Sequence, residues 1–199
     1  WWHLALFHLE RDDVDEVLKL FDGPIFGARS TVVIDLVDAT AMLWRLQLRG
    51  VDVGDRWQAV ADNWAPIAGA GNYAFNDMHA MMAFVGSGRR DGQSTVLSAQ
   101  RRALDAGDDS ADFAREVGSA ATRAMQAFGD GDHAQAASLL RTIRSRAHRF
   151  GGSHAQRDVI DLTLIEAALR GGDAALAGAL AAERQALRPR SPLARRFLD

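Results

Sequence analysis

Apolar residues recur along this chain at the three- and four-residue spacing of amphipathic helices, while strand-like alternation is scarce. Glycine and aspartate mark the turns between these helical segments. The predicted helical segments are, in order, residues 2–10, 13–21, 31–49, 56–67, 75–88, 91–107, 110–131, 132–152, 153–172 and 173–192. The pattern therefore predicts an all-α protein.

Two helix starts have a recognisable capping sequence. Asp13 is followed three residues later by Glu16, and Ser153 is followed at the same spacing by Gln156. In a capping box, the first side chain accepts from a backbone N–H and the second reaches back to the cap residue. The two glycines before Ser153 favour a turn with positive φ. Most of the stretch "GGSHAQRD" is thereby explained as helix punctuation, with His154 exposed in the first turn.

The helical segments form five predicted hairpins of about 35–45 residues each, a period typical of helix-pair solenoids. In two of them, small residues lead into Gly-Asp and then an alanine-rich helix, as in "AMQAFGDGDHAQAASLL". This arrangement is similar to the tetratricopeptide pattern. We therefore expect an α-solenoid of about five antiparallel helix hairpins, a tetratricopeptide-repeat-like superhelix, spanning residues 1–199 as a single array. The start "WWHLALF" suggests the C-terminal part of a longer chain.

Composition narrows the classes of function. The chain has 199 residues, 48% of them hydrophobic and 25% charged, with a net charge of −3, so no polyanion-binding signature is present. No segment approaches the ~18 apolar residues of a membrane span. Without cysteine, thiolate catalysis and Cys-based zinc sites are excluded, and Lys19 as the sole lysine removes most Schiff-base options. We expect a cytoplasmic protein with no cofactor, no metal site, and no nucleic-acid or membrane partner.

The segment 31–49 carries a single polar stripe on an otherwise apolar helix. Asp35, Asp38, Met42, Arg45 and Arg49 follow one another at spacings of three and four. The stripe either faces solvent or, in a solenoid, lines the groove formed by the first helices of the pairs. Asp38 and Arg45 are two turns apart, too far to pair without a partner or ligand between them.

Two further first helices present polar groups. His3, Phe7 and Glu10 share one face of residues 2–10. In "FNDMHAMMAF", Asn76 and His79 share a face beside Asp77, although Asn76 or Asp77 could equally cap the helix. His79, set among methionines, fits a hydrogen-bonded core histidine better than a ligand or a general base.

Charged and aromatic residues elsewhere have plain structural interpretations. Trp44, Trp57 and Trp64 are expected in the core. In residues 153–172, Arg157 can pair with Asp161 at i+4 and Asp158 suits the positive end of the helix dipole, but a binding role for these two charges stays open. No His-x-x-x-His spacing is present on any predicted helix.

Five segments resemble the C-terminal half of the tetratricopeptide repeat protein 38 family. They are "WHLALFHLE", "VVIDLVDATAMLWRLQLRGVDVGDRWQ", "FNDMHAMMAFVG", "GGSHAQRD" and "AAERQALRPRSPLARR". The resemblance implies a tetratricopeptide-type superhelix with further helices upstream, and no assigned reaction. His154 departs from the family pattern. The matching positions are His3, Asp38, Arg45, Arg56, Trp57, Asn76, Asp77, His79, Gln156, Arg157 and Asp158.

Three hypotheses for function remain open. The first is a helical module that binds a protein, peptide or small ligand in its concave groove. The second is an enzyme or tight small-molecule binder with a His/Asp/Arg pocket, in which Asp–His pairs would transfer protons and arginine would hold an anion. The third is a structural subunit. The predicted binding residues are His3, Asp38, Arg45, Trp57, Asn76, Asp77, His79, Gln156, Arg157 and Asp158; the sequence predicts no catalytic residue.

Overall fold

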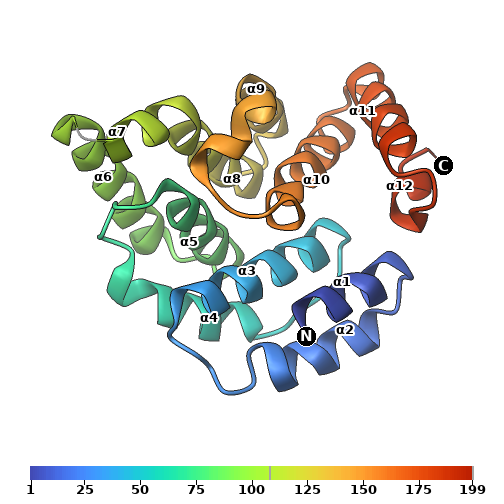
Figure 1. Cartoon of the computed structure of the whole chain (residues 1–199), viewed down its shortest axis with the longest axis horizontal. Helices are drawn as coiled ribbons and strands as arrows, with labels where there is room; N and C mark the ends of the chain where they lie inside the picture. The colour runs from blue at the N-terminus through green and yellow to red at the C-terminus, as the bar shows by residue number, and fades with distance from the viewer. Residues whose placement is uncertain (108, 199) are drawn as a thin grey trace.

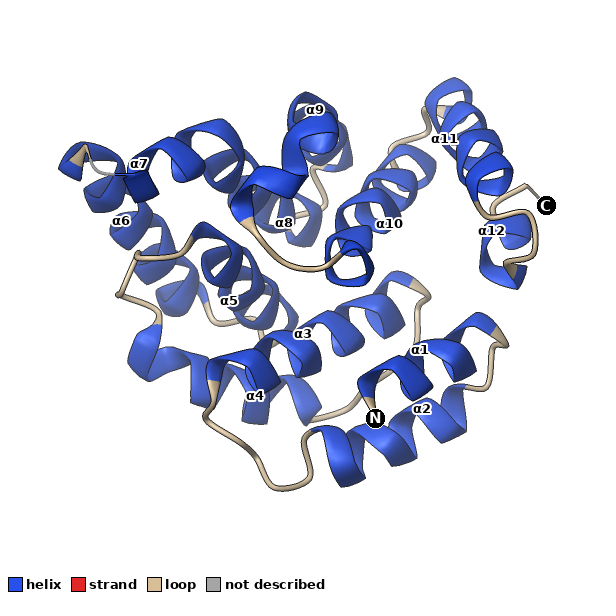
Figure 2. Ribbon diagram, viewed as in Figure 1, coloured by secondary structure: helices blue, strands red, loops and turns tan. Residues whose placement is uncertain are grey.

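The computed structural model describes residues 1–107 and 109–198, and within these ranges the chain forms helices and turns without a strand (Figure 2). The α-helices are α1 (Trp2–Glu10), α2 (Val14–Leu20), α3 (Val33–Leu48), α4 (Arg56–Trp64), α5 (Ala74–Gly86), α6 (Arg90–Ala106), α7 (Asp109–Phe113), α8 (Ser119–Gly129), α9 (His133–Ile143), α10 (His154–Arg170), α11 (Ala174–Leu187) and α12 (Pro192–Arg196). Short π- or 3₁₀-helical segments extend several of them: η1 (Phe21–Ile25), η2 (Ala65–Ile67), η3 (Ala114–Gly118) and η4 (Arg144–Phe150). The predicted all-α class is confirmed for these residues. None of the described helices is long and apolar enough to cross a membrane.

Helices that follow one another in the chain pack as neighbours (Figure 1). Contacts join α1 to α2, α3 to α4, α5 to α6, α8 to α9, and α10 to α11. The members of each predicted pair are thus in contact, and so are α4 with α5 and α9 with α10. The predicted segment 110–131 is one continuous helical run up to Gly129, in which the π-helical stretch η3 connects α7 to α8.

The first helices of the pairs also pack against one another. Contacts run from α3 to α5, from α5 to α8 and from α8 to α10, and α10 in turn contacts α3. In this last contact, the indole Nε1 of Trp44 donates to Oγ1 of Thr163 at 2.9 Å, and both side chains are fully buried. Four helices thus enclose a common core, and residues more than a hundred positions apart meet in it (Figure 1).

Buried aromatic side chains fill this core, as expected for Trp44, Trp57 and Trp64. Trp64 donates its Nε1–H to Oγ1 of Thr40 at 2.8 Å, so its polar atom is satisfied away from water. Trp57 packs directly on the backbone of Gly86, where a Cβ atom would lie 2.3 Å from the indole ring. The tryptophans therefore join neighbouring helices by packing.

Side-chain caps predicted for two helices are not observed. Asp13 precedes α2, but its carboxylate pairs with Nδ1 of His8 at 3.0 Å instead of capping the helix, so the predicted capping box with Glu16 is wrong. Neither Asn76 nor Asp77 caps α5, because the helix already begins at Ala74 and both residues lie inside its first turns.

The helix predicted from residue 31 begins later, at Val33. The hydroxyl of Ser30 donates to Oδ2 of Asp35 at 2.6 Å and accepts from the backbone N–H of Val32 at 3.2 Å. This local turn competes with helical hydrogen bonding and delays the start of α3.

A pair of glycine substitutions tests the helix packing. A Cβ on Gly92 of α6 would lie 2.4 Å from the ring of Phe84, whereas a Cβ on Gly178 of α11 would meet nothing within 4 Å. We expect Gly92→Ala to lower the free energy of unfolding by about 1–3 kcal/mol through overpacking. Gly178→Ala should raise it by about 0.5–1 kcal/mol, because alanine favours a helix. Urea unfolding followed by circular dichroism measures both values, and equal effects would contradict the α5–α6 packing.

Candidate functional site

The central part of the polar stripe on α3 is covered by two other helices. From α1, Trp2 donates Nε1–H to the carbonyl of Asp38 at 3.0 Å, and the carbonyl of Leu9 accepts from Nη1 of Arg49 at 2.5 Å. From α10, Nε2 of Gln156 donates to Oδ1 of Asp38 at 3.1 Å. The stripe therefore faces neither bulk water nor an open groove, which were the two expectations for it.

Arg45, in the middle of this stripe, is 3% exposed. Its Nη1 donates to the carbonyl of Ala41 at 2.9 Å and its Nη2 to the carbonyl of Ala155 at 2.6 Å. Its guanidinium carbon also lies 5.5 Å from the centroid of the Trp2 ring. Within the described parts of the chain, Arg45 forms no ion pair with a carboxylate. Burial lowers the pKa of Arg45 to about 10, so its charge remains at neutral pH.

The first turn of α10 lies between Asp38 and Arg45. Gly152, with φ of +75°, brings the chain against Phe75, where a Cβ would lie 2.5 Å from the ring. The predicted capping box is confirmed: Ser153 accepts from the N–H of Gln156, and Gln156 Oε1 accepts from the N–H of Ser153. The first turn of α10 thus bridges Asp38 and Arg45: Gln156 binds Asp38, and the carbonyl of Ala155 binds Arg45.

Arg157 turns back toward the loop before α10. Its Nη1 donates to the carbonyl of Gly151 at 3.1 Å and to the carbonyl of Gly152. The predicted pair with Asp161 is wrong, because Asp161 is bound by Arg144 at 2.6 Å and the loop carbonyls take the guanidinium. Among residues 1–107 and 109–198, Arg157 has no carboxylate partner within ion-pair distance.

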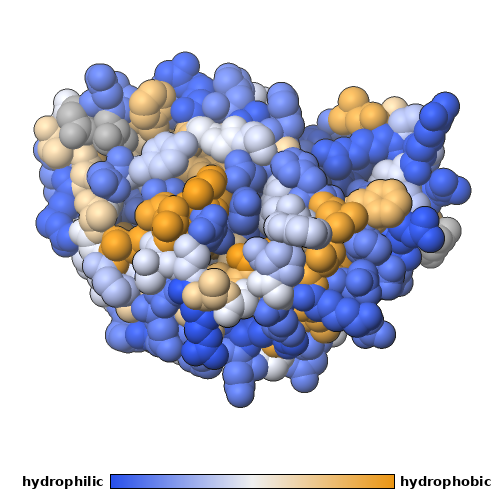
Figure 3. All heavy atoms as spheres, turned by 60° about the horizontal axis from the view of Figure 1, so that its bottom comes forward, coloured by the Kyte–Doolittle hydropathy of each residue, from blue (hydrophilic) through white to orange (hydrophobic). Residues whose placement is uncertain are grey.

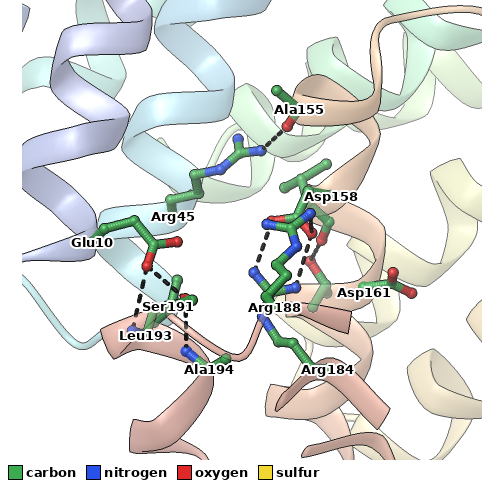
Figure 4. Close-up of polar contacts among 12 residues, drawn as sticks. Glu10, Arg45, Ala155, Asp158, Asp161, Arg184, Arg188, Ser191, Leu193 and Ala194 are labelled. Atoms are coloured by element: carbon green, nitrogen blue, oxygen red, sulfur yellow. Dashed lines mark hydrogen bonds and ion pairs between the residues drawn. The ribbon is translucent and has the colours of Figure 1, made fainter. Parts of the chain in front are cut away.

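Asp158 is held by two arginines from the end of α11 and the residue after it (Figure 4). Arg184 makes a bidentate pair with it, at 2.8 and 2.9 Å, and Nη2 of Arg188 lies 2.9 Å from the same carboxylate. Burial raises the pKa of Asp158, but the hydrogen bonds and charge of Arg184, with the charges of Arg188 and Arg45, outweigh it. The pKa of Asp158 therefore lies below its usual value. This buried ionic contact fixes α11 to α10.

On the opposite side of Arg188, α1 meets the start of α12 (Figure 4). Oε2 of Glu10 accepts from the hydroxyl of Ser191 at 2.6 Å and from the backbone N–H of Leu193 at 3.4 Å. Ser191 also caps α12 by accepting from the N–H of Ala194 at 3.0 Å. These hydrogen bonds join α1, near the N-terminus, to α12, near the C-terminus, beside Arg188.

Two spaces adjoin Asp158 and Arg188. One is a cavity of about 70 Å³, whose polar lining comes from Glu10, Arg45, Asp158 and Arg188. The other is a cleft of about 260 Å³, which we call the Arg157 cleft. Its charged and titratable lining residues are Arg144, His148, His154, Arg157, Asp158, Asp161 and Arg188. Arginine side chains line both spaces.

Among the described residues, the remaining predicted site residues make no hydrogen bond or ion pair with this group, although His3 lies near enough to Asp38, and His79 to Arg45, for their charges to interact. His3 is exposed and packs edge-on against Trp2. Asn76 is half-buried. Trp57 lies in the α4–α5 packing described above. Of the ten predicted residues, the structure brings Asp38, Arg45, Gln156, Arg157 and Asp158 together around the first turns of α10.

His79 is a buried core histidine, the interpretation that the sequence favoured. Its Nδ1 lies 2.8 Å from the carbonyl of Phe75, and the two rings pack at 4.4 Å between centroids. Burial lowers the pKa of His79 to about 4, so the imidazole is neutral at pH 7. A neutral imidazole packed in this way is suited to a structural role.

Sequence reasoning missed Arg184, Arg188 and Arg144 as members of the site. Arg184 and Arg188 are four residues apart in "AAERQALR", a spacing that places both on one helix face. That spacing was the available signal, but their shared partner Asp158 lies in another helix. No group of three or more His, Asp or Glu side chains that could hold a metal ion occurs among the described residues.

No protein-family model matches the chain, and no solved structure matches it. The site is therefore defined by its own contacts and charges: a buried carboxylate is held by two arginines, and beside it lies Arg157, whose partners among the described residues are backbone carbonyls and a histidine.

Removing the Asp158 carboxylate tests the contact between α10 and α11. Asp158→Asn leaves the buried Arg184 charge uncompensated, so we expect the free energy of unfolding to fall by about 3 kcal/mol. The control is Asp112→Asn, which breaks an exposed pair with Arg115 and should cost less than about 0.5 kcal/mol. Urea unfolding at pH 7 measures both losses. Equal losses would show that the ionic contact of Asp158 with Arg184 and Arg188 does not hold α10 and α11 together.

Asp77 gives a pH-dependent prediction. Burial raises the pKa of its carboxyl to about 6, although Gln100 Nε2 donates to it at 3.4 Å. The folded state then binds the proton more tightly than the unfolded state, so stability falls as the pH rises from about 4 to above 6. Asp77→Asn should remove this loss, raising the free energy of unfolding by about 1–3 kcal/mol at pH 8 and by little at pH 4. Urea unfolding across this range, with Asp112→Asn as control, measures the difference; a pH-independent effect contradicts the assignment.

Proposed function

We propose that this chain is a tetratricopeptide-type helical module that binds a protein or peptide partner through the Arg157 cleft. Five consecutive helix pairs, with their first helices in mutual contact, support a solenoid-type arrangement. The five sequence segments quoted above support a relation to the tetratricopeptide repeat protein 38 family. A cytoplasmic location belongs to the same proposal.

The distribution of the polar side chains favours partner binding over catalysis. His79 is neutral and packed on Phe75, whereas Asp77 bonds to Gln100, so these two side chains do not form an acid–base pair with each other. The cavity beside Arg45 measures about 70 Å³, whereas small-molecule sites occupy roughly 300–1,000 Å³. An enzyme pocket on the inner helices therefore has little support.

The observation that carries the proposal is the charge of the Arg157 cleft. Asp158 and Asp161 are each bound by arginines of the chain itself, whereas Arg157 donates to the carbonyls of Gly151 and Gly152. His148 and His154 are exposed at the same cleft. Arginine in this setting recognises carboxylates through its fixed fork of donors. A partner that presents acidic side chains fits the cleft.

A random-peptide phage library selected against the wild-type chain tests this function. We expect enriched peptides to contain Asp or Glu. Synthetic copies should bind His148→Glu about tenfold more weakly, because the new carboxylate repels them at the interface. Fluorescence anisotropy measures the dissociation constants.

The matched control is Arg141→Glu, an exposed position on α9 that does not line the cleft. It should leave the affinity unchanged. Failure to enrich any peptide, or equal effects of the two substitutions, would contradict partner binding at the Arg157 cleft.

A further inference from the structure

A second and larger cleft lies between α1 and the turn that joins α11 to α12. We call this space, of about 620 Å³, the Phe7 cleft. It is lined by Phe7, Arg11, Arg188, Pro189, Arg190 and Pro192, with Glu10 and Ser191. Arg188 also lines the Arg157 cleft, so both spaces border the same side chain.

The apolar part of the Phe7 cleft is exposed. Phe7 is 55% exposed, and Leu4, three residues earlier on the same face of α1, is 41% exposed. Leu187, at the end of α11, is 72% exposed. Figure 3 shows apolar residues gathered in separate patches on an otherwise hydrophilic face. Of these residues, Phe7 lines the cleft itself, and an exposed apolar side chain in a cleft is typical of an interaction site.

The rim of the Phe7 cleft is cationic. Three arginines line it, Arg11, Arg188 and Arg190, and of these Arg188 is paired with Asp158. Arg11 lies 5.6 Å from the centroid of the Phe7 ring, and Glu10 is engaged by Ser191 and the N–H of Leu193. The cleft thus combines an apolar wall with positive charge that its single carboxylate does not balance.

We propose that the Phe7 cleft binds an acidic, amphipathic segment of a partner protein. An apolar side chain of that segment packs against Phe7, Pro189 and Pro192, while its carboxylates pair with Arg11 and Arg190. This inference rests on the proposed function and specifies the chemistry of the partner. The apolar groups line a shallow, open cleft between two chain segments, along which an amphipathic segment can lie with its apolar face on Phe7 and its carboxylates toward the arginines.

The peptides selected on the wild-type chain test this inference. We expect them to combine Phe, Leu or Trp with Asp or Glu, and to bind both Phe7→Ser and Arg190→Glu at least about tenfold more weakly. The matched controls are Phe113→Ser, which removes another partly exposed aromatic ring, and Arg141→Glu. Both should bind the peptides as the wild type does, and circular dichroism should show that all four variants are folded.

Three results would overturn the inference. The first is that the selected peptides lack apolar residues, or that they bind Phe7→Ser as tightly as the wild type. If those peptides still bind His148→Glu more weakly than the wild type, the proposed function survives and only the Phe7 cleft is rejected. The second is the absence of enriched peptides, which rejects both. The third is sedimentation of the chain with phosphatidylserine–phosphatidylcholine vesicles that Phe7→Ser abolishes, which assigns the cleft to a membrane surface.

Discussion

The contact between α3 and α10 determines how the rest of the chain is arranged. It places a charged guanidinium, that of Arg45, where water cannot reach it, and satisfies that group with the backbone carbonyls of Ala41 and Ala155. Burying such a charge without partners would cost several kcal/mol, so α10 must dock in one register. The Trp44–Thr163 hydrogen bond two turns further along α10 fixes the same register.

The α3–α10 contact leads directly to the ionic cluster. Because α10 is fixed at its first turn, Asp158 points toward α11, where Arg184 and Arg188 bind it (Figure 4). Arg188 then borders both clefts. Arg188, the arginine that both clefts share, is therefore held in place by Asp158 before any partner arrives, which reduces the entropy that this side chain loses on binding.

Local features were predictable because they depend on residues a few positions apart. The Ser153–Gln156 capping box, the positive φ of Gly151 and Gly152, and the burial of the tryptophans all follow from helix periodicity and turn chemistry. Where a local alternative existed, prediction failed. Asp13 pairs with His8 instead of capping α2, and Arg157 donates to the loop carbonyls instead of pairing with Asp161.

The sequence by itself determined the helices, their order along the chain and the side chains that fill the core. These features depend on the three- and four-residue spacing of apolar residues within each helix. Only the tertiary structure decided what the charges do. Arg45 meets a carbonyl 110 positions away, and Glu10 meets a serine 181 positions away. Spacing along one helix says which side chains share a face, but the partner opposite that face depends on how separate helices dock. Docking depends on the packing of many side chains at once.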